Sequence, residues 1–162
     1  MKVISIDPGY ERVGVAVIER NGNKEDLIFS ECIETSRKVS HPERLSVIGK
    51  RVADLIQQFQ PGFLATESLF FKNNQKTAMK VSEARGVVIY EAQKVGIKIF
   101  EYTPLQIKIA VTGYGRSEKG QITEMVKKLI KINKPIKYDD EYDAIAVGLT
   151  FFAIDFNKAG KK

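Results

Sequence analysis

Short apolar stretches bounded by turn residues are typical of β-strands, and five of them occur along the chain. They cover residues 2–6, 12–19, 26–34, 63–66 and 97–102. Turns at Pro8-Gly9 and Asn21-Gly22-Asn23 separate the first three stretches, so these three are predicted to form an antiparallel meander.

Between and after these strands, apolar residues recur at the three- and four-residue spacing of amphipathic helices. The predicted helices cover residues 45–59, residues 77–95, a short segment after Pro104, residues 121–132 and a last segment that opens at Asp140. This order of elements indicates an α/β fold in which helices flank a central mixed five-stranded sheet. Because the 162 residues contain no repeat or linker, we predict one domain over residues 1–157 and a basic tail over residues 158–162.

The charge balance narrows the choice of partner. A net charge of +6 favours a polyanion such as nucleic acid, although a lysine-rich surface alone would give the same excess. The single cysteine, Cys32, excludes an intrachain disulfide, and its apolar surroundings predict a small buried side chain and no nucleophile. Because no signal-like segment or run of membrane-spanning length occurs, we expect a soluble cytoplasmic protein.

Four carboxylates stand where an apolar segment ends or a helix begins, namely Asp7, Glu67, Asp140 and Asp143. If the strands that end at Asp7 and Glu67 are neighbours in the sheet, both acids line one cleft, and the last helix can add the other two. Carboxylates crowded in this way repel one another, which raises their pKa values, and hard cations such as Mg²⁺ or Mn²⁺ remove that repulsion. The pattern therefore indicates two-metal hydrolysis of a phosphodiester.

These acids also have simpler interpretations. Asp7 precedes Pro8-Gly9 and suits a turn, and Asp140 suits the start of a helix. Asp139 could replace Asp140 in the set. The three-residue spacing to Asp143 favours Asp140, because it places both carboxylates on one helix face.

Six short blocks of sequence, taken together, carry a family resemblance. They are Asp7-Pro8-Gly9 with Gly14 beyond it, Thr66-Glu67-Ser68-Leu69-Phe70, Glu83-Ala84-Arg85-Gly86-Val87, Gln106-Ile107-Lys108, Ser117-Glu118-Lys119 and Asp140-Glu141-Tyr142-Asp143-Ala144. In this order and spacing, over residues 1–152, the chain resembles RuvC, the family of bacterial Holliday junction resolvases.

The resemblance implies a ribonuclease H-like fold and a homodimer that makes paired symmetric nicks in four-way DNA junctions, in DNA recombination and repair. It also implies Mg²⁺, with two ions per active site and Mn²⁺ as a possible substitute. The products would carry 5′-phosphate and 3′-hydroxyl ends. A branch-migration motor of the RuvA and RuvB type would be a further partner.

The resemblance also assigns roles to single positions. The four acids match the catalytic residues that bind the metal. Lys108 and Lys119 match lysines near the scissile phosphate, where a compact ammonium suits a developing negative charge. Lys108 is predicted to be catalytic, because Ile107 and Ile109 would anchor its backbone. Lys119 follows a glycine-rich turn and is predicted to bind DNA.

Phe70 matches an aromatic residue that stacks on an unpaired base at the junction centre, where stacking contributes roughly 1–3 kcal/mol per base. Core packing is the simpler alternative. The side chains predicted to contact DNA around it are Lys72, Asn73, Lys76, Lys80 and Arg85. For Arg85, a salt bridge with Glu67 or Glu83 is an equal alternative. His41 is expected to cap a helix or to be solvated.

Two other functions stay open. One is a nuclease of viral or mobile-element type that also cuts flaps and forks. The other is a junction-binding scaffold without catalysis, which the four acids disfavour because negative charge weakens DNA binding. The chain departs from the family in having Thr150-Phe151-Phe152 where many relatives carry a histidine, and Tyr10-Glu11 where a small residue is usual. The helix over residues 77–95 is the predicted dimer interface.

Overall fold

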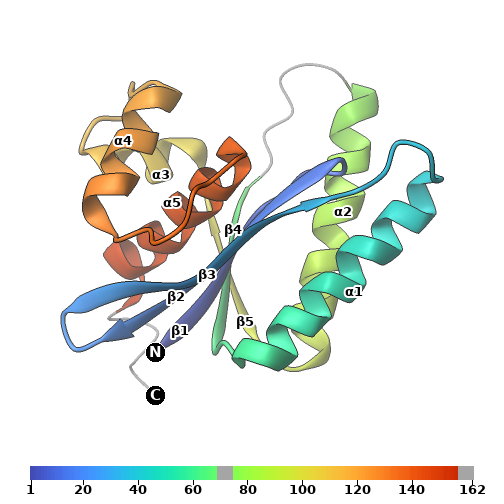
Figure 1. Cartoon of the computed structure of the whole chain (residues 1–162), viewed down its shortest axis with the longest axis horizontal. Coiled ribbons are helices and arrows are strands. Elements are labelled where there is room, and N and C mark those ends of the chain that lie inside the picture. Colours follow the sequence, from blue (N-terminus) through green and yellow to red (C-terminus); the bar gives the residue numbers. More distant parts are fainter. Residues whose placement is uncertain (69–74, 157–162) are drawn as a thin grey trace.

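The computed structural model describes residues 1–68 and 75–156, with the backbone alone for residues 75 and 76. In this part of the chain, five strands form one sheet in the order β3-β2-β1-β4-β5 (Figure 1). They are β1 (Lys2–Asp7), β2 (Arg12–Asn21), β3 (Lys24–Glu34), β4 (Phe63–Glu67) and β5 (Lys98–Tyr102). The first three strands pair antiparallel, whereas β4 runs parallel to both β1 and β5. The predicted meander and the predicted mixed sheet are confirmed.

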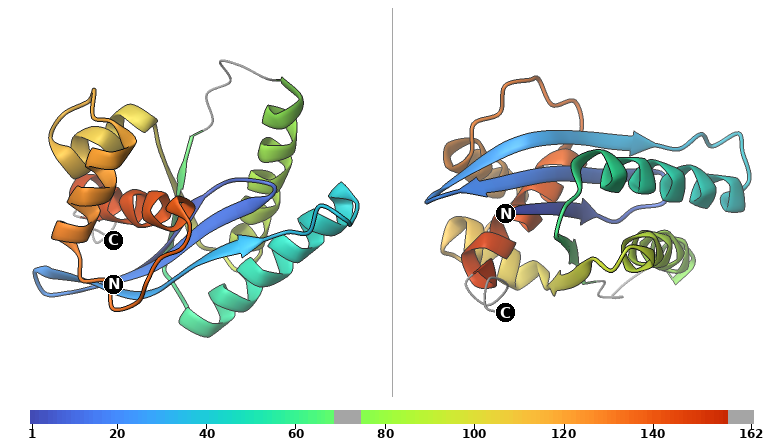
Figure 2. Two further views of the ribbon diagram at one scale, coloured as in Figure 1. Left: turned by 45° about the horizontal axis from the view of Figure 1, so that its top comes forward. Right: turned by 90° about the horizontal axis from the view of Figure 1, so that it is seen from below.

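Helices cover both faces of this sheet (Figures 1 and 2). They are α1 (His41–Phe59), α2 (Gln75–Lys94), α3 (Pro104–Thr112), α4 (Lys119–Leu129) and α5 (Asp139–Ile154). α1 and α2 lie on one face, and α3, α4 and α5 lie on the other. Each face has its own apolar core, so the sheet is the middle layer of three.

The alternation of side chains along a strand decides which face each acid takes. Val3 in β1 and Ala65 in β4 belong to the core under α5, whereas Ile4 in β1 belongs to the core under α1 and α2. Because residues separated by an even number share a face, Asp7 and Glu67 point to the α5 side at the carboxyl ends of their strands. The strand pattern therefore directs both acids to one face.

Several helix boundaries differ from the prediction by one to four residues, because α1, α2 and α4 also begin earlier than predicted. α4 ends at Leu129, whereas the apolar pattern predicts helix to residue 132. Ile130 is extended, with φ −137° and ψ 139°, and both Ile130 and Ile132 contact the core from the connection that follows. β-branched residues in alternation favour extended backbone, so burial of these two does not need a helix. α5 begins at Asp139, one residue before the predicted start.

The cap of α1 is Ser40, whose hydroxyl accepts a hydrogen bond from the Glu43 amide while the Glu43 carboxylate accepts one from the Ser40 amide. The expected capping role of His41 is therefore wrong. His41 Nε2 instead lies 2.5 Å from Glu83 Oε2 in α2, which ties the start of one helix to the other.

Cys32 is partly exposed, so the prediction of a buried side chain is also wrong. It sits on β3 opposite Gly14. Burial, followed by the nearby Asp140 carboxylate, raises the pKa of its thiol to about 12, which excludes a thiolate nucleophile.

Several predicted positions lie outside the described residues. They are Phe70, Lys72, Asn73, the side chain of Lys76 and the tail over residues 158–162. Among the helices in residues 1–68 and 75–156, none has the length and apolar character needed to cross a membrane.

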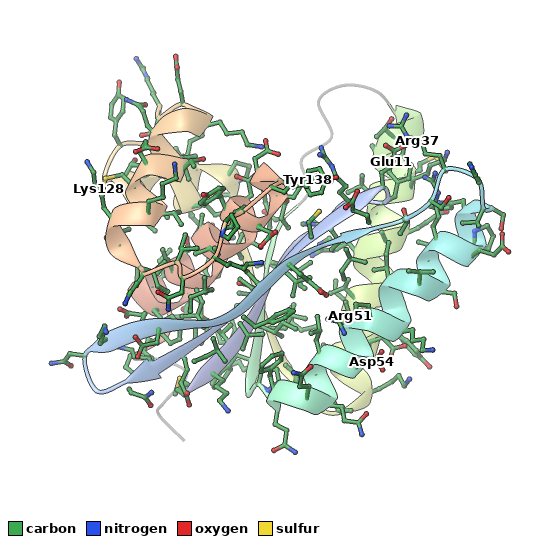
Figure 3. The ribbon with its side chains drawn as sticks, viewed as in Figure 1. Glu11, Arg37, Arg51, Asp54, Lys128 and Tyr138 are labelled. Atoms are coloured by element: carbon green, nitrogen blue, oxygen red, sulfur yellow. The ribbon has the colours of Figure 1, made fainter. Side chains whose placement is uncertain are left out.

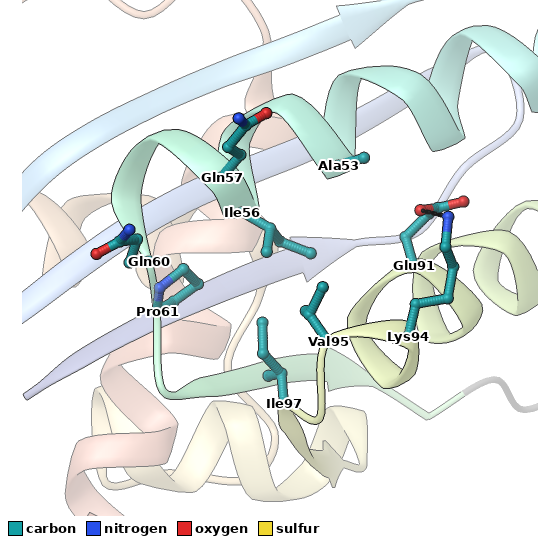
Figure 4. Close-up of a pocket in the computed structure, with 9 residues that line it drawn as sticks. All are labelled: Ala53, Ile56, Gln57, Gln60, Pro61, Glu91, Lys94, Val95 and Ile97. Carbon is teal, nitrogen blue, oxygen red and sulfur yellow. Dashed lines mark hydrogen bonds and ion pairs between the residues drawn. The ribbon is translucent and has the colours of Figure 1, made fainter.

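A hollow lies between the carboxyl-terminal ends of α1 and α2 (Figure 4). Ile56, Pro61, Val95 and Ile97 give it an apolar floor, and Glu91 at its rim is bound by Lys94 at 2.9 Å. It opens where β4 and β5 begin, at the edge of the sheet opposite the acids. Ligand sites of open α/β sheets lie at the carboxyl ends of the strands, so this hollow is not the candidate site.

Candidate active site

The carboxyl ends of two parallel strands bring the first two acids together. β1 and β4 are neighbours, and Ile6 pairs with Thr66, so Asp7 and Glu67 follow at equivalent positions. The expectation that these strands lie side by side is confirmed. The acids at the ends of the two strands therefore form a pair on one face of the sheet.

α5 adds Asp140 and Asp143, and a glycine permits its approach. Gly14 pairs with Asp7 across the β1–β2 ladder. A Cβ atom on Gly14 would lie 1.9 Å from the Asp140 carbonyl oxygen, so the start of α5 rests directly on the backbone of β2. The four carboxylates Asp7, Glu67, Asp140 and Asp143 are called the acidic cluster below.

The negative charges of these carboxylates act on one another. Burial raises the pKa of Asp7 to about 8, and the negative charges of Asp143, Glu67 and Asp140 add to the effect in that order. Burial likewise raises the pKa of Glu67 and that of Asp143. Without a bound cation, Asp7 therefore carries a proton at neutral pH.

Lys119 is the lysine that contacts the acidic cluster. Its Nζ lies 2.8 Å from Asp143 Oδ2 and 2.6 Å from Asp139 Oδ2. Burial lowers the pKa of this ammonium, but the hydrogen bonds to Asp139 and Asp143 outweigh burial and raise it. Asp139 is half exposed and its pKa is lowered by Lys119, so it acts as an outer partner of the lysine.

Lys108 lines the same hollow as Glu67, Lys119 and Asp143, as the sequence predicts for a residue of the cleft. Among the described residues it forms no ion pair within 4 Å. Of its two expected anchors, Ile107 is buried but Ile109 is 50 % exposed. The direct contact with the acids thus belongs to Lys119, which the sequence ranks second.

Arg12 is a neighbour of the acidic cluster that the sequence does not reveal. Its Nε lies 3.4 Å from Asp140 Oδ2, and its guanidinium lies 5.0 Å from the centre of the Tyr138 ring. Tyr138 in turn donates a hydrogen bond of 2.8 Å to Glu34. A basic residue at the start of a strand is too common to signal this contact, because the partner is 128 positions away in the chain.

A buried polar network holds the first turn of α5 against β3. Glu141 is 6 % exposed, and its Oε2 accepts hydrogen bonds from Lys134 Nζ at 2.7 Å and from Ser30 Oγ at 2.9 Å. Lys134 Nζ also donates to the Ser30 carbonyl at 2.6 Å. Because Glu141 lies between Asp140 and Asp143, the network orients the turn that carries both acids.

Glu141→Ala is expected to lower the free energy of unfolding by about 2 kcal/mol, because it leaves the Lys134 ammonium and the Ser30 hydroxyl without their acceptor. Glu124→Ala is the matched control, since it removes an exposed glutamate that binds Lys127 at 2.8 Å. That change should stay within about 0.5 kcal/mol. Urea unfolding of the three proteins measures the difference, and equal midpoints for the two variants would contradict the network.

Two further predicted DNA contacts can be located. Arg85 is partly buried, and its guanidinium pairs at 2.5 Å with Glu101 at the end of β5. The salt-bridge alternative is thus realised with a third acid, and neither Glu67 nor Glu83 is the partner. Lys80 is exposed on α2, on the other side of the sheet from the acidic cluster.

The donor chemistry of the acidic cluster suits a hard divalent cation, because every donor is a carboxylate oxygen. Asp140 Oδ2 is buried and accepts no hydrogen bond among the described residues, although Arg12 Nε lies 3.4 Å from it as an ion pair. In the same part of the chain, no group of three or more His, Cys, Asp or Glu side chains is arranged so that it could hold a metal ion. The cluster fits a cation by chemistry, and Lys119 supplies positive charge within it.

Comparison with known proteins gives a consistent picture. Residues 3–151 match the family model described as crossover junction endodeoxyribonuclease RuvC. A protein of that name from Finegoldia magna is 46 % identical over 149 residues, which cover 92 % of this chain and 91 % of the relative. One from Petrotoga mobilis is 44 % identical and covers 99 % of both chains.

A solved structure is similar over the same length. It is RuvC of T. thermophilus in complex with a Holliday junction substrate, with a TM-score of 0.90 and 30 % identity. The alignment covers 98 % of this chain and 97 % of that one. The predicted ribonuclease H-like α/β fold is thereby confirmed.

Proposed function

This chain belongs to the RuvC family of crossover junction endodeoxyribonucleases, and on that premise we propose that it resolves Holliday junctions at the acidic cluster. It is a nuclease that hydrolyses phosphodiester bonds of DNA. The observation that supports the assignment of the site is the meeting of β1, β4 and α5, because these elements carry the four carboxylates, which are partly buried, and Lys119 contacts one of them. The junction seen with the T. thermophilus relative supports four-way DNA as the substrate.

The acidic cluster would hold Mg²⁺, with two ions per active site and Mn²⁺ as a substitute. Bound Mg²⁺ would supply an activated water and would stabilise charge on the leaving oxygen. Asp7 must lose its proton before it can bind a cation, because burial and its acidic neighbours hold its pKa near 8. Cation binding should therefore release a proton near neutral pH.

The two lysines would act on the phosphate. Lys119, already fixed by Asp143 and Asp139, places an ammonium at the edge of the cluster, where it offsets phosphate charge. Lys108 lines the same hollow without a carboxylate partner in the described chain and is therefore available to the DNA. Cleavage would leave 5′-phosphate and 3′-hydroxyl ends. Stacking by Phe70, and phosphate contacts by Lys72, Asn73 and Lys76, remain predictions.

A homodimer would give one active site for each of the two nicks, in a two-fold arrangement that suits a four-way junction. The predicted interface is α2, whose apolar residues divide into two faces. Ala84, Val88 and Ala92 are buried in the chain's own core. Met79 and Tyr90 are 66 % and 62 % exposed, and their spacing places both on the outer face. That outer face would pack against a second copy.

Tyr90→Glu is expected to convert the dimer to a monomer at micromolar concentration, because it would bury a charge in the proposed interface. Tyr114→Glu is the matched control, since Tyr114 is 57 % exposed in the connection between α3 and α4. Sedimentation velocity measures both. A monomeric wild-type protein, or a Tyr90→Glu protein that remains dimeric, would contradict this interface.

A motor of the RuvA and RuvB type would act on the same DNA as a separate partner.

The substrate is tested by cleavage of four-way, three-way and flap DNA of matched arm sequence. A resolvase should make paired symmetric nicks in the four-way junction alone. Comparable cutting of flaps and forks would indicate the broader branched-DNA nuclease. Binding of the four-way junction without any cutting would indicate the scaffold.

A further inference from the structure

A polar pocket opens beside the β1–β2 turn, on the α1 and α2 side of the sheet. Its polar lining comes from Tyr10, Glu11, Arg37, His41, Arg44 and Lys80, and it is called the Tyr10 pocket here. Figure 3 shows Glu11 and Arg37 together near the amino-terminal end of α2. The pocket and the acidic cluster share the edge of the sheet at which β1 ends, but they lie on opposite faces.

Three cations converge on two adjacent residues of this pocket. The Arg44 guanidinium and the Lys80 ammonium lie 5.6 Å and 5.2 Å from the centre of the Tyr10 ring. Arg37 Nη2 binds Glu11 Oε2 at 2.7 Å, whereas Arg44 Nη1 is 3.8 Å from the other oxygen of Glu11. The Glu11 carboxylate thus faces two guanidinium groups, and a third cation, Lys80, lies over the adjacent Tyr10 ring.

The remaining charges nearby do not restore the balance. Two further acids, Glu83, which contacts His41 Nε2, and Glu43, which is engaged in the α1 cap, do not line the pocket. Lys80 has no carboxylate within 4 Å in the described part of the chain. Arg37 lowers the pKa of Glu11, so that carboxylate is ionised and already counted against the cations. Among the residues that line the Tyr10 pocket, three cations thus stand against the single carboxylate of Glu11.

Hydrogen bonds within the protein hold the residues of the pocket in position. Arg44 is 7 % exposed, and its Nε donates a hydrogen bond of 2.8 Å to the Ser36 carbonyl. The Thr35 hydroxyl donates 2.7 Å to the Tyr10 carbonyl, and the Thr35 amide donates 2.9 Å to the Glu11 carbonyl. These bonds fix the turn that begins directly after Asp7. A ligand in the pocket is thus held at a set position relative to the acidic cluster.

We propose that the Tyr10 pocket binds a backbone phosphate of the DNA, at a distance from the phosphate that is cut. The inference rests on the proposed function. Arg37 and Arg44 are suited to a phosphate because a guanidinium can donate two parallel hydrogen bonds, and Lys80 adds a mobile ammonium. Glu11 competes with the phosphate for Arg37 and weakens DNA binding. Contacts to a backbone phosphate carry no sequence information, so the pocket would set affinity and position without sequence preference.

The double variant Arg37→Gln with Lys80→Gln tests the proposal, because both side chains are exposed and neither supports the core. Four-way junction binding is measured without divalent metal, across a series of salt concentrations. The variant should bind about tenfold more weakly, and the slope of log Kd against log salt should fall by about 1 to 2. The matched control is Lys50→Gln with Lys131→Gln, which removes two exposed lysines outside the pocket. The control variant should lose less than about threefold in affinity for the junction.

Glu11→Gln gives a change of opposite sign. Removal of the competing carboxylate should tighten junction binding by about threefold or more. Equal losses for the two double variants, or no tightening with Glu11→Gln, would overturn the proposal while leaving the nuclease assignment intact. A wild-type protein that fails to bind or cut the junction would overturn the proposed function itself, so the two failures are distinguishable.

Discussion

Asp7→Asn is expected to reduce the rate of DNA nicking by at least about 10³-fold while junction binding persists or tightens. Asp7 is the partly buried acid on which the charges of Asp143, Glu67 and Asp140 all act, so its loss removes a central ligand of the proposed cation site. Single-turnover nicking and gel-shift binding measure the two effects. Asp26→Asn removes the same charge from an exposed pair with Lys24, and it should leave the rate within about twofold.

The same substitution should stabilise the protein when no divalent metal is present. The pKa of Asp7 is raised from 3.8 to about 8, so the folded protein keeps a proton that the unfolded chain releases. Wild-type stability therefore falls as the pH rises from 3.8 to about 8. Asparagine has no proton to lose, so Asp7→Asn should be more stable at pH 8 by an amount on the order of a few kcal/mol. Equal urea midpoints for the wild-type and Asp7→Asn proteins at pH 8 would contradict the raised pKa of Asp7.

Gly14→Ala is expected to destabilise the fold by about 3 kcal/mol and to reduce nicking by about 10²-fold or more. The new methyl group would lie 1.9 Å from the Asp140 carbonyl oxygen, which is backbone and cannot rotate away. The start of α5 must move, and it carries Asp140 and Asp143 with it. Thermal unfolding and single-turnover nicking measure the two losses.

Two other glycines provide graded controls for this effect. At Gly148, an added Cβ would meet Ser5 Oγ at 2.7 Å and Ile18 Cδ1 at 2.8 Å, which are side-chain atoms that can shift. At Gly62, it would meet nothing within 4 Å. The loss should therefore decrease from Gly14→Ala to Gly148→Ala to Gly62→Ala. Equal stability of all three variants would contradict close packing of α5 on β2.

The sequence predicts the acid pair at the strand ends because its signals are local. Each acid directly follows a short apolar strand, and neighbouring parallel strands end at the same edge of the sheet. Asp140 and Asp143 are likewise recognisable, because three-residue spacing at a helix start places them on one face. What the sequence leaves undetermined is the distance between these pairs. The side chain that is absent at Gly14 decides that distance.

The sequence does not predict which charged residues of different helices and strands form ion pairs. Lys119 lies closer to the acids than Lys108 because the connection between α3 and α4 turns it back toward α5, and no local pattern encodes that turn. The pairing of Arg85 with Glu101 depends in the same way on how α2 packs beside β5. Helix periodicity also misplaces the end of α4, because buried isoleucines continue the apolar pattern in extended backbone.

The most direct test of the account is to map nicks in an immobile four-way junction that is end-labelled on each strand in turn, with and without Mg²⁺. The account predicts Mg²⁺-dependent nicks at symmetric positions on two opposed strands, and none with Asp7→Asn. Cutting that persists without divalent metal, or that occurs equally in linear duplex DNA, would contradict it.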